Sequence, residues 1–168
     1  MESDQLKSVQ APLKELYRDN PSSAFITLRA FGKIGENISC KVETGKSLVE
    51  AGLHPATGGD GSLVCSGDML LESLVACAGV TLNAVATAIE FDLIDGRIYA
   101  EGDLDFRGTL GVSKAAAVGF EAIRLTFEID TPEDRDRIDT LIRLTERYCV
   151  VYQTLSGGVP VELLVKME

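Results

Sequence analysis

One long apolar stretch, residues 66–91, constrains the fold of this 168-residue chain more than any other segment. Over residues 74–89 its only polar side chains are Thr81, Asn83 and Thr87. Apolar residues therefore surround the whole circumference of the predicted helix instead of forming one stripe, which is typical of a helix buried on all sides. At about 1.5 Å per residue, its 26 residues span about 39 Å, about the diameter of a small domain. The sequence thus predicts a central core helix that other elements or a second subunit must cover.

This stretch is also long enough to cross a membrane, but its sequence argues against insertion. Polar or charged side chains interrupt it at Glu72, Asn83 and Glu90, and basic residues do not flank it. A membrane-spanning helix needs about 20 predominantly apolar residues, with basic residues near its cytoplasmic end. We therefore interpret the stretch as a core helix and expect no membrane partner.

Composition and motifs limit the partners and the compartment. Sixteen Lys and Arg against 26 Asp and Glu give a net charge of -10, which repels phosphate backbones, so no nucleic-acid partner is expected. The first eight residues lack the basic patch and apolar run of a secretory signal, which predicts a cytoplasmic location and no structural disulfides. The four cysteines form no C-x-x-C pair, and the single histidine, His54, lies far from them. Glycine-rich nucleotide motifs are also missing, so we expect neither a metal site nor a cofactor.

The rest of the chain predicts an α+β fold, with helices packed against an antiparallel sheet. Residues 1–20 are expected to form an amphipathic helical arm, and residues 21–168 a single domain. Gly32 and Gly35 should bound the turn of a first hairpin. Strands are expected where polar and apolar residues alternate, over 24–31, 36–44, 47–51, 97–107, 123–130 and 159–166.

Local signals also predict where the two most clearly patterned helices begin. Ser66 is the expected N-cap of the central helix, with Asp68 in its first turn, where a negative charge is favourable. The second helix should begin with Thr131 as its cap and Pro132 at its first position. Cys149 falls on the apolar face of this second helix, so its side chain should point inward.

Two cysteines stand on these helices. Cys77 lies near the middle of the central helix, between two alanines and Gly79, where small side chains let another backbone or a substrate approach the sulfur. A buried free cysteine alone is often an inert small hydrophobe. The segments A-C-A-G-V-T-L around Cys77 and E-R-Y-C-V-V-Y-Q-T-L around Cys149, however, resemble the two cysteine motifs of the OsmC/Ohr family of thiol-dependent hydroperoxide reductases. The resemblance extends over residues 24–168.

The resemblance implies both an architecture and a reaction. The architecture is an intertwined homodimer, in which sheets from both chains enclose the two central helices. In the reaction, Cys77 attacks a hydroperoxide, Cys149 condenses with the resulting sulfenic acid, and an external dithiol reduces the pair. Apolar residues around the thiols would favour organic hydroperoxides, as suits a protein of the oxidative stress response.

The groups that would lower the pKa of the Cys77 thiol are less evident from the sequence. The family commonly has a Pro-Glu pair at the start of the central helix, whose Glu orients an activating Arg, but Gly67 stands at the Glu position here. Family members also usually have Pro after the second cysteine, where this chain has Val150. The candidate activating groups are Asp68 and Glu72 as acids, and Arg29, Lys33 and His54 as cations.

Two alternatives remain open. One is a non-catalytic OsmC-like dimer that binds a small apolar ligand and has incidental thiol reactivity, which the missing Pro-Glu pair favours. The other is a structural protein with inert thiols that react with thiol reagents only after denaturation.

Overall fold

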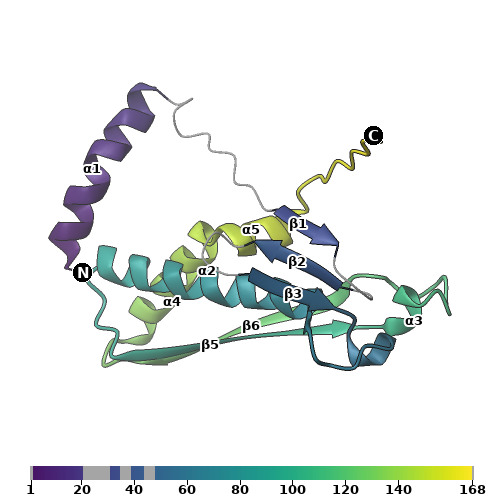
Figure 1. Ribbon diagram of the computed structural model, residues 1–168. Helices are drawn as coiled ribbons and strands as arrows, with labels where there is room; N and C mark the ends of the chain where they lie inside the picture. The colour runs from purple at the N-terminus through teal and green to yellow at the C-terminus, as the bar shows by residue number, and fades with distance from the viewer. Residues whose placement is uncertain (1, 21–30, 35–38, 44–47, 168) are drawn as a thin grey trace.

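The computed structural model describes residues 2–20, 31–34, 39–43 and 48–167, and shows a mixed α/β fold (Figure 1). In chain order the elements are α1 (Ser3–Asp19), β1 (Phe31–Ile34), β2 (Ser39–Glu43), β3 (Leu48–Gly52), the short 3-10 helix η2 (Pro55–Thr57), β4 (Val64–Cys65), α2 (Ser66–Ala88), β5 (Asp95–Leu104), α3 (Phe106–Thr109), β6 (Phe120–Asp130), α4 (Arg135–Tyr148) and α5 (Val150–Gly157). The predicted succession of strands, a long helix, strands and a second long helix is confirmed.

The first sheet is built from four short strands. Its order is β1-β2-β3-β4, with antiparallel neighbours except for the short parallel pair β3-β4. The first pair aligns Phe31 with Glu43 and confirms the predicted hairpin. Gly32 lies within β1 and not at the turn, so the predicted bounds of that turn are wrong. Residues 24–30 of the expected first strand lie outside the described residues.

The second sheet is a long antiparallel ribbon of β5 and β6, in which Asp95 is opposite Asp130. Exposed and half-buried residues alternate along β5, as the sequence predicts. The strand ends earlier than predicted, because Phe106 and Arg107 belong to α3. The Asp105 carboxylate accepts a hydrogen bond from the Arg107 N–H at 3.0 Å and caps this short helix.

Helix α2 runs along the ribbon and packs against β5, α4 and α5 (Figure 1). It begins at Ser66 with Cys65 at the N-cap, so the prediction of Ser66 as the cap is wrong by one residue. Among the described residues it is the one helix long and apolar enough to span a membrane. Its fully buried positions recur every three or four residues and are Leu74, Ala78, Leu82, Val85 and Ala86.

This buried stripe covers only one face of α2. On another face Val80 is 73% exposed and Leu70 is also exposed. The expectation that α2 is buried around its whole circumference is therefore not met within one chain. An apolar helical face of this kind needs a covering surface from elsewhere.

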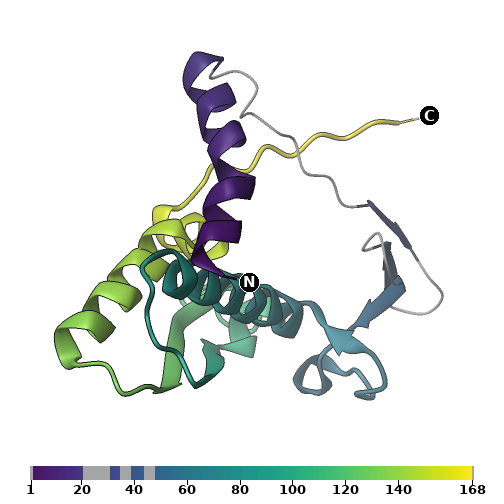
Figure 2. The same cartoon turned by 90° about the vertical axis from the view of Figure 1, so that its left-hand side faces the viewer.

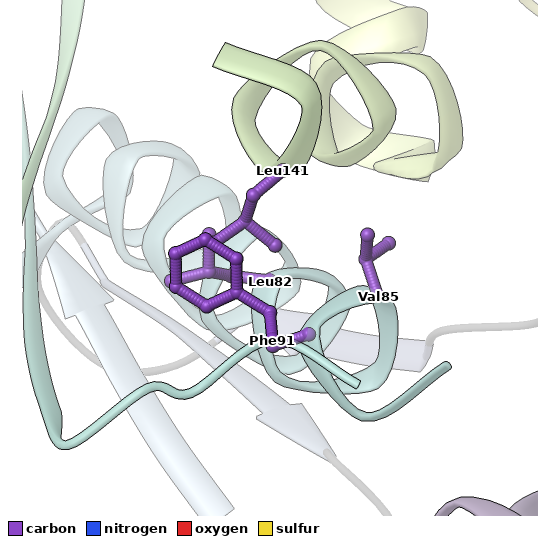
Figure 3. Close-up of a cluster of buried hydrophobic side chains, with 5 residues drawn as sticks. Leu82, Val85, Phe91 and Leu141 are labelled. Atoms are coloured by element: carbon purple, nitrogen blue, oxygen red, sulfur yellow. The ribbon is translucent and has the colours of Figure 1, made fainter. Parts of the chain in front are cut away.

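The main core lies where α2 meets α4. Leu141 of α4 is fully buried and points toward Leu82 and Phe91 (Figure 3). Val85 and Ala86 complete this cluster of buried residues. Partly buried side chains from β6 and from the rest of α4 pack around it. This contact fixes α4 alongside the second half of α2.

Polar contacts cap the C-terminal end of α2. The Arg137 guanidinium donates to the carbonyl oxygens of Ile89 and Glu90, at 3.3 and 2.9 Å, and lies 5.7 Å above the Phe91 ring. Glu90 has φ 54, a left-handed conformation that ends the helix. The Arg137 side chain thus satisfies carbonyl groups that a helix end leaves without internal partners.

Helix α4 begins later than its sequence signals predict. The hydroxyl of the expected cap, Thr131, accepts from the Glu133 N–H at 3.1 Å and also donates to the Asp92 carbonyl at 2.6 Å, while the Glu133 carboxylate accepts from the Asp92 N–H at 3.1 Å. Asp134 is the N-cap and accepts from the Arg137 N–H at 2.9 Å. Tertiary hydrogen bonds to the loop after α2 therefore occupy the residues that were expected to start the helix.

Helix α1 begins beside the end of α2 and projects away from the body, and the C-terminal segment also extends away from it (Figures 1 and 2). The predicted N-terminal helix is α1, which touches the end of α2 through an ion pair of Lys7 with Glu90 at 3.3 Å. Residues 159–167 have no regular structure, and Val161 and Met167 are each 92% exposed. The predicted final strand is therefore wrong for the single chain, since no described strand of this chain pairs with it.

Candidate active site

Cys77 stands on the part of α2 that faces the helical layer. It is half-buried, and the neighbouring Leu74 and Ala78 are fully buried. The sequence suggests that Gly79 leaves room beside the sulfur, but residues two apart in a helix do not share a face. A Cβ at Gly79 would lie 3.5 Å from the Cδ1 atom of Ile98 on β5, so Gly79 faces the ribbon and this expectation is not met.

Cys149 lies at the junction of α4 and α5. It is both the C-cap of α4 and the N-cap of α5, with φ -74 and ψ 107, which interrupts the helical path. Its N–H donates to Thr145 and its carbonyl accepts from Gln153, each at 2.9 Å. The side chain is only 1% exposed, so the predicted inward orientation of Cys149 is confirmed.

The packing of α4 on α2 explains how the two cysteines meet. Arg137 contacts the carbonyl of Ile89. From that contact, Cys77 lies twelve residues back along α2 and Cys149 lies twelve residues forward along α4. At about 1.5 Å per residue both distances are about 18 Å, so two helices that run antiparallel bring the cysteines level with one another. Both thiols are free, and they lie close enough for each to shift the pKa of the other.

Their surroundings favour ionisation of Cys77 over Cys149. Burial opposes ionisation of Cys77, but hydrogen bonds from the N–H of Val151, the Cys149 thiol, the N–H of Val150 and the Thr81 hydroxyl together lower the pKa of Cys77 below its ordinary value. Burial raises the pKa of Cys149, and the hydrogen bond and negative charge of Cys77 raise it further. Of the two thiols, Cys77 is therefore the one that ionises more readily.

Of the other predicted site residues, Asp68 and His54 are described by the structure and do not join this pair. Asp68 lies nine residues before Cys77 on α2, about 13 Å along the helix axis. Arg29 lies outside the described residues, and Lys33 lies on β1 with a side chain that is also outside them. His54 precedes η2, and its ring stacks on Phe106 with 5.0 Å between centroids.

Asp68 and His54 instead line a separate cavity of about 350 Å³ at the start of α2. Cys65 and Phe120 also line it. The Nδ1 atom of His54 accepts a hydrogen bond from the Ala56 N–H at 3.0 Å, which fixes the ring in the loop. Among the described residues no group of three His, Cys, Asp or Glu side chains is placed to hold a metal ion.

Sequence reasoning missed the hydrogen-bond donors around Cys77. Thr81 follows Cys77 by four positions, so helical spacing alone could have placed it on the same face. The N–H groups of Val150 and Val151 had no comparable signal. Their position depends on the break at Cys149, where the sequence has neither Gly nor Pro.

Comparison with known proteins finds the same fold in OsmC-like proteins. Residues 59–164 match the family model described as OsmC-like protein. An OsmC-like protein from Mycoplasma pneumoniae is 20% identical with a TM-score of 0.66, over 79% of this chain and 89% of that one. A search among proteins of curated function finds no match.

Two further similar structures are of proteins whose names state a function. An organic hydroperoxide resistance protein OsmC from Legionella pneumophila is 18% identical with a TM-score of 0.62, over 80% of this chain and 92% of that one. The organic hydroperoxide resistance protein OhrB of Bacillus subtilis is 21% identical with a TM-score of 0.54, over 85% of this chain and all of that one. At such identities the likeness shows the fold alone.

Proposed function

Because the chain belongs to the OsmC-like protein family, we propose that it reduces organic hydroperoxides through a dithiol-disulfide cycle of Cys77 and Cys149. One observation carries this proposal: α2 and the junction of α4 and α5 bring two free thiols together, and their surroundings lower the pKa of Cys77 and raise that of Cys149. A peroxidase of this kind needs one readily ionised thiol to attack the peroxide and a second thiol within reach of it to resolve the sulfenic acid. Inert core cysteines would not need this asymmetry.

The reaction proceeds in three balanced steps. The Cys77 thiolate attacks one peroxide oxygen, the O–O bond breaks, and the departing alkoxide takes a proton to become an alcohol, which leaves Cys77 as a sulfenic acid. The Cys149 sulfur then attacks the Cys77 sulfur, and water leaves as the disulfide forms. An external dithiol finally reduces this disulfide and is itself oxidised to a disulfide. This cycle requires a reducing compartment, which supports a cytoplasmic location.

The substrate class follows from the surface beside the thiols. Val80 lies one helical turn after Cys77, and Tyr148 immediately precedes Cys149. Both side chains are exposed in the single chain. Apolar surface around a reactive centre favours the apolar group of an organic hydroperoxide over hydrogen peroxide. The names of the Legionella and Bacillus neighbours support the same class.

Peroxide consumption by the purified protein tests the proposal. With a dithiol such as dithiothreitol as donor, cumene hydroperoxide should be consumed faster than hydrogen peroxide, by about tenfold or more, because each buried methylene adds about 0.8 kcal/mol of apolar stabilisation. The control is the same mixture without protein.

If the protein adds nothing to the rate of the control, the peroxidase is excluded and the second candidate takes its place: an OsmC-like dimer that binds an apolar ligand. The position of Asp68, remote from Cys77, is the observation that favours this candidate.

We also propose that the functional unit is a homodimer. The exposed apolar face of α2 and the exposed apolar segment 159–167 are surfaces that a second copy would cover. Sedimentation at micromolar concentration should therefore show a species of twice the chain mass of 18.0 kDa. A folded monomer under these conditions would contradict the proposal.

A matched pair of variants locates the dimer interface. Val80→Glu places a charge on the exposed face of α2 and should shift the sedimenting species toward the monomer. Val112→Glu is the control, because Val112 has a similar exposure, 72% against 73%, but lies in the connection between α3 and β6. Equal behaviour of the two variants would place the interface elsewhere.

A further inference from the structure

Two side chains of α5 bind the same residue of α4, Glu146, which lies in the last turn of that helix. The Tyr152 hydroxyl donates to the Glu146 carboxylate at 2.9 Å, and the Gln153 side-chain amide donates to the Glu146 carbonyl at 2.8 Å. In an unbroken helix the N–H four residues on would bind this carbonyl, and here the Gln153 side chain binds it across the break at Cys149. Glu146 therefore joins the two helices through both its backbone and its side chain.

Cys149 lies midway along this connection, three residues after Glu146 and three before Tyr152. It continues the buried stripe of α4, since Leu141, Thr145 and Cys149 follow one another at intervals of four and each is at most 1% exposed. Helix α5, by contrast, has no buried residue of its own. Packing of α4 therefore fixes the chain before Cys149, whereas the chain after it depends on the contact of α5 with α2 and on the bonds to Glu146.

The bond from Tyr152 has an ionised acceptor. Hydrogen bonds to charged groups are roughly twice as strong as those between neutral groups. Donation to the Glu146 carboxylate raises the pKa of the Tyr152 phenol above its ordinary value, so the phenol keeps the proton that it donates at neutral pH. The connection is thus intact under the conditions in which the thiols react.

We propose that Glu146 is a positioning residue for the resolving thiol, because its bonds to Tyr152 and Gln153 hold the break between α4 and α5 closed over Cys149. The inference deepens the proposed peroxidase and rests on it for the role of Cys149. Cys77 stands on a different helix, α2. Loosening of α5 therefore changes where the Cys149 sulfur lies relative to the Cys77 sulfur, and it uncovers a thiol that is now 1% exposed.

The accessibility of Cys149 tests this inference without peroxide. The reduced full chain is treated with iodoacetamide, and peptide mass spectrometry follows the product at each cysteine. The double variant Tyr152→Phe/Gln153→Ala removes both bonds to Glu146 and keeps the aromatic ring. Alkylation of Cys149 should become about fivefold to thirtyfold faster, because the thiol reacts through local opening of the segment that covers it. Cys65, a free thiol at the start of α2, is the internal reference and should keep its rate.

Variants of Glu146 itself separate its side chain from its place in the helix. Glu146→Ala removes the acceptor for Tyr152 but leaves the carbonyl for Gln153, so Cys149 should be alkylated about threefold faster. Glu146→Gln keeps an acceptor oxygen and should recover most of the protection. Tyr99→Phe is the matched control, because Tyr99 donates to the Glu128 carboxylate at 3.1 Å on the β5-β6 ribbon, in another exposed Tyr–Glu bond. It should leave Cys149 at the parent rate.

The lifetime of the Cys77 sulfenic acid gives a second readout, which a purely structural role would not change. After one equivalent of cumene hydroperoxide, the sulfenic acid waits for the Cys149 sulfur to attack and for water to leave. In the double variant Cys149 is less often in position, so capture of Cys77 by a dimedone-type reagent should rise by about threefold or more. Tyr99→Phe should show the parent level of capture.

Failure of this inference can be distinguished from failure of the proposed function. Faster alkylation of Cys149 with unchanged Cys65 supports the inference, even if the protein consumes no peroxide. Equal rates at Cys149 in the parent and the double variant overturn it, even if the protein proves to be a peroxidase. A parallel rise at Cys65 also overturns it, because the whole fold has then loosened. If circular dichroism shows that the double variant does not fold, the comparison of Glu146→Ala with Glu146→Gln decides the question.

Discussion

Cys77→Ser should reduce peroxide turnover to the rate of the control without protein. Cys149→Ser should still consume one equivalent of peroxide, because its Cys77 thiol is intact. A serine hydroxyl is not ionised at neutral pH, so Cys77→Ser removes the nucleophile. In Cys149→Ser the Cys77 sulfenic acid forms but finds no thiol to condense with. A dimedone-type reagent should therefore label Cys77 in Cys149→Ser after peroxide treatment, and should label neither position in Cys77→Ser. Mass spectrometry of the labelled peptides provides the measurement.

Cys65→Ser is the control for this pair. Cys65 is also a free thiol, but it lies at the N-cap of α2, in the separate cavity. Its replacement should leave turnover close to that of the parent protein. Labelling of Cys149 in Cys77→Ser would mean that the two roles are reversed. Full turnover in Cys77→Ser would remove the dithiol cycle altogether.

The largest loss of stability is expected from Leu141→Ala. Leu141 is fully buried in the cluster that joins α4 to α2, where its neighbours are Leu82 and Phe91 (Figure 3). Truncation removes its apolar contacts and leaves a cavity, which typically costs about 2–5 kcal/mol. For a chain of this size, that loss corresponds to a melting temperature lower by about 5–15 °C. Thermal unfolding at matched protein concentration measures it, because an oligomer's melting temperature depends on concentration.

Leu16→Ala makes the same chemical change on the surface of α1. The Leu16 side chain is 47% exposed, and Leu and Ala have similar helix propensities, so the free energy of unfolding should change by less than about 0.5–1 kcal/mol. If the two variants lower the melting temperature equally, the contact between α2 and α4 is not the main core.

The sequence predicts features that depend on local periodicity. The alternation over residues 97–104 predicts β5, and the long apolar run after Ser66 predicts α2, because each pattern fixes one element without reference to another. The resemblance around Cys77 and Cys149 identifies the pair on which the candidate site is built. These parts of the fold and the site can be recognised from the amino-acid sequence alone.

Features that depend on distant partners could not be predicted in this way. Thr131 has the local chemistry of a helix cap, but its hydroxyl is bonded to Asp92, which lies 39 residues earlier. Residues 159–166 have the composition of a strand, but a strand exists only where another strand pairs with it. The donors at Val150 and Val151 depend on the helical break at Cys149, and this break arises where α4 ends against α2.

The Arg137 contacts make one part of the helical layer more resistant to local unfolding than another. The guanidinium joins the end of α2 to the first turn of α4, beside the buried cluster around Leu141. Helix α5, by contrast, has no buried residue of its own. Amide protons around Ile89 should therefore exchange with solvent only when the whole domain unfolds, whereas those of α5 can exchange through local opening. The resolving thiol thus lies at the boundary between a firmly packed helix and one that can open locally, so opening of α5 would expose the buried Cys149 side chain while the cluster around Leu141 stays packed.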